Sequence, residues 1–230
     1  MSVNIILGKG SKVSLSIPGS DSSVEPIAAI PTIGATGPAK GATEISIAAL
    51  PSGVLIPSGA YLNFKQSNGA EKIARLTADA VGGDTTIEVA ALAEAILSGA
   101  TAAWPLRLRG RTNADLDRTG NRISSTSFDD DGYTTGLTAS ITNGLTTNGN
   151  WLPLDAGYAT AEYAFNELME IYIKLELPVP SRAYSKGRVY KGPAGITGMP
   201  LAVPADGVIS GNIQMAFNGK PTIVDPVPVA

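Results

Sequence analysis

The chain has 230 residues, of which 43% are apolar and 16% are charged, so it is long enough to bury one sizeable core. Histidine and cysteine are both absent. Their absence excludes disulfide scaffolds, zinc sites built from these residues, haem ligation through histidine, cysteine nucleophiles and acid–base catalysis by histidine. The composition therefore argues against an enzyme, and we expect no cofactor.

Charge is distributed unevenly along the chain. Residues 112–180 hold three basic and ten acidic side chains, whereas residues 181–230 hold five basic and two acidic ones. The net charge of the whole chain is −3, which argues against a nucleic-acid-binding domain rich in lysine and arginine. The acidic middle and the basic tail predict either two patches that meet on neighbouring copies of one protein or a set of solvated loops.

Neither a membrane span nor a secretion signal is predicted. No stretch approaches the roughly 18 consecutive apolar residues that cross a bilayer, so we expect no membrane partner. The first ten residues have no basic segment ahead of their short apolar run, which a secretion signal requires.

The first forty residues predict strands followed by an extended segment. Residues 3–7 are apolar, and residues 8–11 form a glycine-rich turn. Apolar and polar residues then alternate over 13–17, which indicates a strand with one buried face. Residues 18–40 are rich in proline, glycine, serine and alanine, and they predict a loop or an extended arm that lies on another surface.

An internal repeat marks the next segment. The sequence GATEISIAAL at 41–50 matches GDTTIEVAAL at 83–92, and each copy leads through a leucine to a Ser-Gly-Ala turn. Between the copies, residues 61–65 and 72–78 predict a hairpin closed by an Asn-Gly turn. Two such units can bury their apolar faces on each other, so we expect a small all-β subdomain rather than a solenoid.

One helix is predicted in the chain, over residues 156–169. Its apolar face has helical spacing and consists of Tyr158, Ala161, Phe165, Leu168 and Met169. Polar side chains lie on the opposite side of the same stretch. This pattern predicts a helix that packs on a sheet.

The rest of the second half predicts strands and loops. Residues 112–150 are polar and turn-rich, so we expect little regular structure there. Strands are predicted over 171–177 and 208–217, and the tail 221–230 is expected to be extended.

The fold class that follows is mainly β with one helix. We divide the chain into the N-terminal strands and arm of the main domain (1–40), an inserted β subdomain with the repeat (41–106) and the remainder of the main domain (107–230).

The acidic run Asp129, Asp130 and Asp131 is the obvious candidate metal site, because hard cations prefer oxygen ligands on a flexible loop. The run lacks the alternating ligand spacing and the terminal glutamate of an EF-hand loop. A solvated acidic loop is the simpler interpretation, so we expect no metal.

Basic residues form two candidate groups. The first group consists of alternating arginines whose side chains share one face of a strand, where they could hold a phosphate, bind a partner's carboxylates or be solvated. The basic tail supplies a second set of cations. The candidate inter-subunit residues are Arg107, Arg109 and Arg111, and Arg182, Lys186 and Arg188.

Catalytic and phosphate-binding motifs are missing from the sequence. The glycine-rich stretches 8–11 and 192–195 lack the spacing of a P-loop and a following helix. No Gly-x-Ser-x-Gly nucleophile elbow is present. Nothing in the sequence predicts an active site.

Several of these segments together resemble phage tail tube (major tail) proteins. The opening, with Gly-Lys-Gly at 8–10 and the alternating strand after it, resembles the start of many such proteins. Residues 41–89 resemble an inserted β module common in phage virion proteins, and residues 204–222 resemble the final sheet strand of the family.

The resemblance implies a tail tube subunit with two packed β-sheets, sandwich- or barrel-like, and one helix. Such subunits form hexameric rings that stack around a channel for DNA passage into the host. In this family the N-terminal arm and a long loop reach adjacent subunits or rings, and residues 18–40 and 112–150 are the matching stretches. The family gives no catalytic residues to transfer.

The implied partners are further copies of the chain, a sheath or terminator protein, and a baseplate or initiator protein. DNA would pass through transiently and without sequence preference, in a virion tail assembled in the host cytoplasm. Because acidic side chains repel the DNA backbone, we expect some acids of 112–180, with Asp129, Asp130 and Asp131 as candidates, to face the lumen or a neighbouring subunit.

Other functions fit parts of the pattern. A tail terminator, a head–tail connector or a capsid decoration protein could contain the same inserted module. A carbohydrate-binding module would need an exposed aromatic cluster, and aromatic residues make up only 6% of the chain. The form of assembly separates the virion components, since a terminator stops at one ring whereas a tube protein polymerises.

Overall fold

The computed structural model describes residues 10–124 and 136–229, and in these ranges it contains eighteen strands and one helix. The mainly β fold class with a single helix is therefore confirmed. The predicted strand at residues 3–7 lies outside the described residues.

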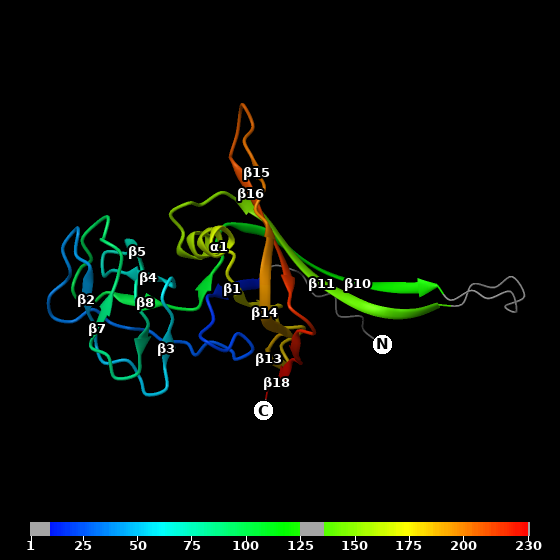
Figure 1. Ribbon diagram of the computed structural model, residues 1–230, viewed down its shortest axis with the longest axis horizontal. Coiled ribbons are helices and arrows are strands. Elements are labelled where there is room, and N and C mark those ends of the chain that lie inside the picture. Colours follow the sequence, from blue (N-terminus) through cyan, green and yellow to red (C-terminus); the bar gives the residue numbers. More distant parts are fainter. Residues whose placement is uncertain (1–9, 125–135, 230) are drawn as a thin grey trace, which may run out of the picture.

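One nine-stranded sheet forms the larger part of the molecule (Figure 1). Its main path runs in the order β10-β11-β16-β14-β12-β1-β9, with β15 paired to β16 and β17 paired to β14, all antiparallel. The strands are β1 (Lys12–Ser16), β9 (Leu106–Arg107), β10 (Arg111–Ser124), β11 (Gly136–Asn150), β12 (Ile171–Glu176), β14 (Val189–Gly198), β15 (Leu201–Ala202), β16 (Ser210–Phe217) and β17 (Thr222–Val224).

One face of this sheet is apolar, because successive residues of a strand point to opposite sides. Leu15, Leu145, Ile173 and Ile213 are fully buried on that face. Helix α1 (Ala156–Asn166) covers them with its small residues, so helix and sheet share one core. The predicted strands over 13–17, 171–177 and 208–217 correspond to β1, β12 and β16.

The ends of α1 are capped. The side chain of Asp155 accepts a hydrogen bond from the backbone N–H of Tyr158, as an N-cap residue does. At the other end, Met169 donates to the carbonyl of Ala164 and Leu168 donates to that of Phe165, the paired bonds of a Schellman motif. The helix thus stops before the predicted end at residue 169.

This early end corrects part of the predicted apolar face. Leu168 lies beyond the helix with φ of 54°, and its side chain is 92% exposed. Phe165 is 37% exposed, whereas Tyr158 and Ala161 are buried as predicted. Helical spacing would bury Leu168 only if the helix continued past Asn166, and the helix ends there.

A second cluster of buried residues is built from three small sheets. It draws on residues 29–106 and on Ala156 of the helix. The strands are β2 (Glu44–Ser46) with β7 (Thr86–Glu88), β3 (Leu55–Ile56) with β6 (Ala80–Val81), and β4 (Tyr61–Lys65) with β5 (Glu71–Arg75) and β8 (Thr101–Ala103). The division of the chain at residues 41 and 106 stays a prediction.

The two copies of the sequence repeat pair with each other in this cluster. Strand β2 belongs to the first copy and β7 to the second, and Ile45 lies opposite Ile87 with both side chains buried. The hairpin between the copies forms from β4 and β5, and its turn contains Gly69 at a positive φ. The two copies of the repeat therefore bury their apolar side chains against each other.

The segment 18–40 runs without regular strands beside this second cluster. Ala29 and Ile33 are buried in it, and the N–H of Ile33 donates to the carbonyl of Ala100. The predicted extended arm thus lies partly on the chain's own small sheets.

The prediction of little regular structure over 112–150 is wrong. Strands β10 and β11 form a hairpin of 14 and 15 residues that runs out past the other strands (Figure 1). The Asn-Gly pairs at 143–144 and 148–149 suggested turns but lie within β11. Gly149 is needed there because a β-carbon would collide with the carbonyl of Gly110.

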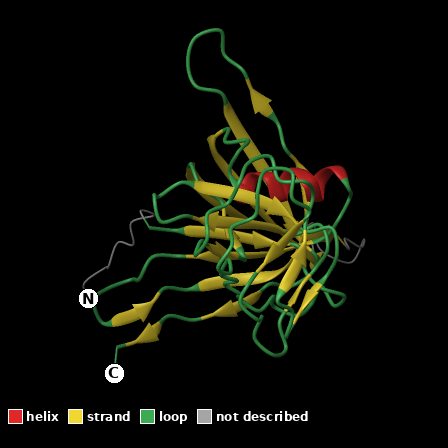
Figure 2. Ribbon diagram, turned by 90° about the vertical axis from the view of Figure 1, so that its left-hand side faces the viewer, coloured by secondary structure: helices red, strands yellow, loops and turns green. Residues whose placement is uncertain are grey.

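Two further features project from the large sheet. A two-stranded ribbon of β13 (Tyr184–Lys186) and β18 (Val227–Pro228) lies near the C-terminus, so the tail is largely extended as predicted. A finger over residues 198–209, between β14 and β16, stands out from the body in both ribbon views (Figures 1 and 2).

We predict that Ile87→Ala lowers the free energy of unfolding by about 2–4 kcal/mol, because it leaves a cavity between the two repeat copies. Ile45→Ala should cost a similar amount, since the two side chains face each other. Urea denaturation followed by circular dichroism measures both. The control Val81→Ala changes a side chain that is 47% exposed, and an equal loss there would contradict the role given to the Ile45–Ile87 pair.

Candidate assembly surfaces

The first basic group does not form one face, which corrects the sequence-based expectation. Arg107 is in β9, Arg109 is in the connection after it, and Arg111 begins β10. Gly110 between them has φ of 65°, so the strand is interrupted and the alternation is lost. The three side chains therefore have separate surroundings.

Arg109 links the two parts of the fold. Its guanidinium forms an ion pair with Glu71 of β5, and its Nε lies 3.9 Å from the Oδ2 of Asp155, the N-cap of α1. Close by, the ring of Tyr61 meets that of Tyr163 edge-on at 6.0 Å between centroids. These contacts fix the small sheets against the helix within one chain.

Arg111 is likewise bound within the chain. Its Nη1 donates to the carbonyl of Gly211 at 2.8 Å and its Nη2 to that of Asn150 at 2.6 Å. The guanidinium also lies 5.9 Å from the ring centroid of Tyr158. Burial lowers the pKa of Arg111, which still remains a cation at any physiological pH.

The pKa of Glu71 reflects the junction with Arg109. Partial burial acts to raise the pKa of the carboxyl, but hydrogen bonds from Arg109 and Asn63 and the charge of Arg109 outweigh it. The net pKa lies below its usual value. The charged form of Glu71 is therefore favoured in the folded state.

The second basic group lies in the ribbon and next to it. Lys186 ends β13, and Arg188, just before β14, forms an ion pair of 2.7 Å with Asp225. Arg182 and Lys186 are exposed and form no ion pair with another described residue. Arg182 and Lys186 are thus available on the surface, whereas Arg188, like Arg109 and Arg111, is bound within the chain.

The acidic run at 129–131 lies outside the described residues. Within residues 10–124 and 136–229, no three acidic side chains gather closely enough to hold a metal ion. In the same ranges no helix has the length and hydropathy to cross a bilayer.

The side of the large sheet away from α1 is polar over β10, β11 and β16. We call this surface the polar face. The register sets Asp115 opposite Thr146 and Asp117 opposite Gly144, and Thr146 in turn opposite Gln214. The described residues of the polar face are Asn113, Asp115, Asp117, Thr119 and Asn121 of β10, Ser140, Thr142, Gly144, Thr146, Asn148 and Asn150 of β11, and Ser210, Asn212, Gln214 and Ala216 of β16.

The polar face combines small polar side chains with acidic ones. Asp115 and Asp117 are its only charged residues in the described part of these strands, and both are exposed. It contains no bulky apolar side chain. Sequence reasoning missed this surface because the polar, turn-rich composition of 112–150 predicts loops, although the alternation of Ala114 and Leu116 with the two aspartates is a usable signal.

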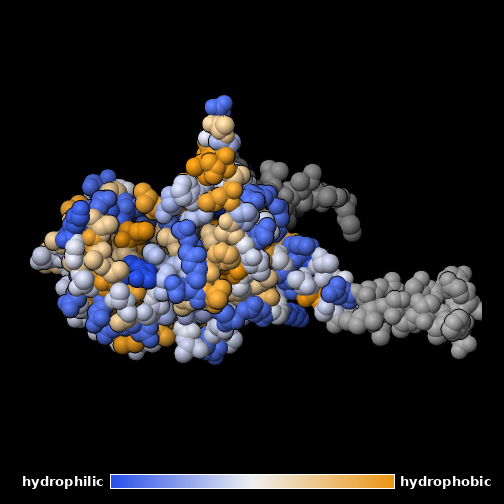
Figure 3. Space-filling model, turned by 45° about the horizontal axis from the view of Figure 1, so that its top comes forward, coloured by the Kyte–Doolittle hydropathy of each residue, from blue (hydrophilic) through white to orange (hydrophobic). Residues whose placement is uncertain are grey.

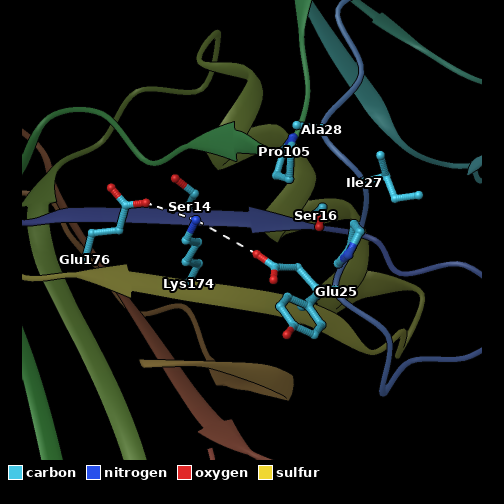
Figure 4. Close-up of a pocket in the computed structure, with 10 residues that line it drawn as sticks. Ser14, Ser16, Glu25, Ile27, Ala28, Pro105, Lys174 and Glu176 are labelled. Carbon is cyan, nitrogen blue, oxygen red and sulfur yellow. Dashed lines mark ion pairs between the residues drawn. The ribbon is translucent and has the colours of Figure 1, made fainter. Parts of the chain in front are cut away.

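The same side of the sheet is covered near β1 and β12. Figure 4 shows Glu25 lying over Lys174 beside Ser14 and Ser16. The Nζ of Lys174 is 3.1 Å from Glu176 and 3.9 Å from Glu25, so its charge is balanced. The polar face therefore does not extend over β1 and β12, where the arm at 18–40 covers the sheet.

Apolar side chains are exposed on the projecting finger. Leu201, Val203 and Val208 are 48%, 71% and 69% exposed, and the apolar finger is visible at the top of Figure 3. Such residues on a projection are typical of contacts with another protein. A second unpartnered surface is the outer edge of β10, which no strand in the described part of the chain pairs.

Comparisons with known proteins give distant likenesses. No family model matches the chain, and no curated protein matches it. Two similar solved chains come from the tail of an empty gene transfer agent particle, with C6 symmetry, and from the virion of a native gene transfer agent particle. Each is 17% identical with a TM-score of 0.42 and covers 50% of this chain, and the coverage of those chains is 82% and 85%. Likeness at this level carries no functional conclusion.

We predict that Glu71→Gln reduces stability at neutral pH by about 1 kcal/mol or less, as expected for a partly exposed ion pair. Because the folded pKa of Glu71 is lowered, its contribution is present above the usual carboxyl pKa and is lost as the pH falls through the folded value. The difference between wild type and variant should therefore shrink below about pH 4.5.

Thermal unfolding at several pH values measures this difference. Glu44→Gln serves as the control, since it removes an exposed carboxylate outside the Arg109 junction. A difference between Glu71→Gln and wild type that stays constant down to pH 3 would contradict the assignment.

Proposed function

We propose that this chain is a structural virion protein of a phage-like particle, the tail tube subunit that assembles into stacked, six-membered rings. The observation that carries the proposal is the nine-stranded sheet with one face packed by α1, the other polar, and an outer edge at β10 that no described strand pairs. The sequence resemblance to tail tube proteins also supports this role. The proposed number of six subunits in each ring comes from that resemblance.

The shape of the chain supports assembly with further copies. The β10–β11 hairpin, the finger at 198–209 and the β13–β18 ribbon extend from the body, and the finger and ribbon expose apolar side chains. Such extensions bury little of their own surface within one chain. A head-to-tail contact between copies closes into a ring when its rotation permits, and a second contact of this kind stacks the rings.

The free edge of β10 fits the same role. A long edge strand offers unpaired backbone groups that tend to pair with another chain. In a ring, each subunit can cover the edge of its neighbour. Edge pairing then contributes to assembly instead of aggregation.

We assign the polar face to the channel. A surface that lets DNA slide must not hold phosphate, so it needs hydroxyl, amide and acidic groups in place of lysine and arginine. The described residues of the polar face have this composition, with Asp115 and Asp117 as its only charges. The other acidic candidates, Asp129, Asp130 and Asp131, belong to the segment that joins β10 to β11.

The remaining partners follow from this role. A terminator or a sheath would contact the outside or the end of the tube, and a baseplate or initiator protein would start its growth. We place the chain in the virion tail, assembled in the host cytoplasm, with no catalytic activity of its own.

Negative-stain electron microscopy of the purified protein at high concentration, with light scattering, tests the proposal. Hollow tubes or stacked rings of constant width are expected. Single rings that never stack would instead favour a terminator or a connector. A protein that stays monomeric even when an initiating complex is supplied would overturn the tube role.

We predict that Asp115→Lys/Asp117→Lys tubes retain short duplex DNA and protect it from nuclease, whereas wild-type tubes do not. Two lysines in place of two aspartates raise the net charge of the polar face by four per subunit, from −2 to +2, and lysine binds phosphate. Co-sedimentation at low salt, followed by nuclease digestion, measures retention and protection.

The matched control is Glu44→Lys/Glu88→Lys, which makes the same change of charge on an exposed pair of the β2–β7 sheet. Its tubes should bind DNA that remains sensitive to nuclease, because the small sheets would lie outside the channel. Protection by the control and not by the polar-face variant would place the small sheets in the channel instead.

A further inference from the structure

We propose that the C-terminal end of α1 in one copy docks into a groove at the far end of β12 in the next copy. The helix-end knob consists of Phe165 and Leu168, with the surrounding carboxylates of Glu162, Glu167 and Glu170. The groove, which we call the tail groove, lies between the end of β12, β13 and β17. This inference rests on the proposed assembly and names the two surfaces that join its subunits.

Leu168 is an unusual residue for its position. The residue after a helix cap in a Schellman motif has a left-handed backbone, which glycine adopts without cost and a leucine does not. Leu168 holds this conformation, with φ of 54°, and also exposes 92% of its side chain to water. Both features are unfavourable in the isolated chain, and a partner that buries the side chain supplies the compensating gain.

The carboxylates around the knob are unfavourable in the monomer for a second reason. The C-terminus of a helix carries a partial negative charge, which favours cations. Here the last turn has no basic residue, and Glu162, Glu167 and Glu170 are all exposed. None of the three forms an ion pair with a described residue. The knob is thus an apolar tip in an acidic surround.

The tail groove has the complementary character. It has a volume of about 720 Å³, and its apolar lining includes Leu177, Pro178, Val179 and Val224. Val179 and Val224 are 47% and 39% exposed, so this lining is open to a partner. The space holds roughly twenty water molecules, which leaves room for the side chains of a leucine and a phenylalanine.

Charge complements the apolar match. Four lysines and two glutamates line the groove, which gives it a net charge of +2. Glu25 and Glu176 pair with Lys174, and Glu25 also pairs with Lys191. Lys12 and Lys186 form no ion pair with any described residue, so they can meet the carboxylates of a knob.

The knob and the groove lie at opposite ends of one strand. The chain passes from the knob into β12 at Ile171, and β12 ends at Glu176 beside the groove. A strand of six residues spans about 20 Å, and it holds the two surfaces apart. Knob and groove therefore cannot meet within one chain, and a contact between them joins copies head to tail.

Because the chain has no cysteine, introduced cysteines can test the contact without background. The double variant Leu168→Cys/Val179→Cys, treated with a short bis-maleimide linker, should give a ladder of covalent oligomers on denaturing gels. Each single variant should stay monomeric. Dimers from Leu168→Cys alone would show a symmetric contact and would overturn the proposal.

The same experiment separates the contact from the proposed function. Tubes without a ladder would refute the knob–groove contact and leave the tube role standing. A ladder whose products form closed rings that never stack would support the contact and refute the tube role. A ladder seen only after removal of residues 1–9 would overturn the proposal, because the chain's own N-terminal segment would then occupy the groove.

Charge reversal gives a second test. Lys186→Glu should weaken the ladder and the assembly, and adding Glu167→Lys in the same chain should restore them. This rescue arises only if the two residues meet across the contact. Equal assembly of wild type and Lys186→Glu would contradict the charge match.

Leu168→Gly is expected to change stability and assembly in opposite directions. Glycine fits the left-handed backbone, so the thermal midpoint of the unassembled protein should rise. The loss of the anchor should raise the protein concentration needed for assembly by about tenfold or more. The control is Leu154→Ala, which truncates another leucine that is 87% exposed and should change neither the thermal midpoint nor the assembly. Unchanged assembly by Leu168→Gly would overturn the proposal.

Discussion

The structure depends on the packing of one short helix between two hydrophobic cores. Helix α1 has 11 residues, and it buries Tyr158, Ala161 and Ala164 against the large sheet while Ala156 packs in the cluster of small sheets. Close approach requires small side chains, and a β-carbon at Gly157 would collide with the carbonyl of Arg107. The ion pair of Arg109 with Glu71 and its approach to Asp155 then fix the same junction from outside.

Much of the fold could be predicted from the sequence because its buried strands alternate clearly and its repeat pairs with itself. The hairpin within the repeat, β1, β12, β16 and the start of α1 follow from local patterns. The β10–β11 hairpin was missed, although Ala114 and Leu116 alternate with two aspartates in β10; β11 has no such signal. Its polar side faces away from the core and its Asn-Gly pairs are typical of turns, so only pairing with β16 identifies β11 as a strand.

The candidate surfaces were harder to predict than the fold, since each depends on where an element stops. Gly110 interrupts the strand that would have aligned Arg107, Arg109 and Arg111, and the end of α1 at Asn166 turns Leu168 outward. Both positions follow the helical or strand spacing in the sequence. The backbone departs from regular geometry at both positions. A prediction from residue spacing alone therefore wrongly aligns the three arginines on one face and wrongly buries Leu168.

The large sheet offers three independent directions for assembly, and each ends in a surface of a different kind. Along its hydrogen bonds it ends at the edge of β10, which no described strand pairs, along its strands at the helix-end knob and the tail groove, and along its normal at the polar face. The proposed apolar and charged contacts along the strands would select the partner, whereas backbone pairing at the edge is tolerant of sequence. In the proposed assembly the polar face is left without a partner among copies, as a channel wall requires.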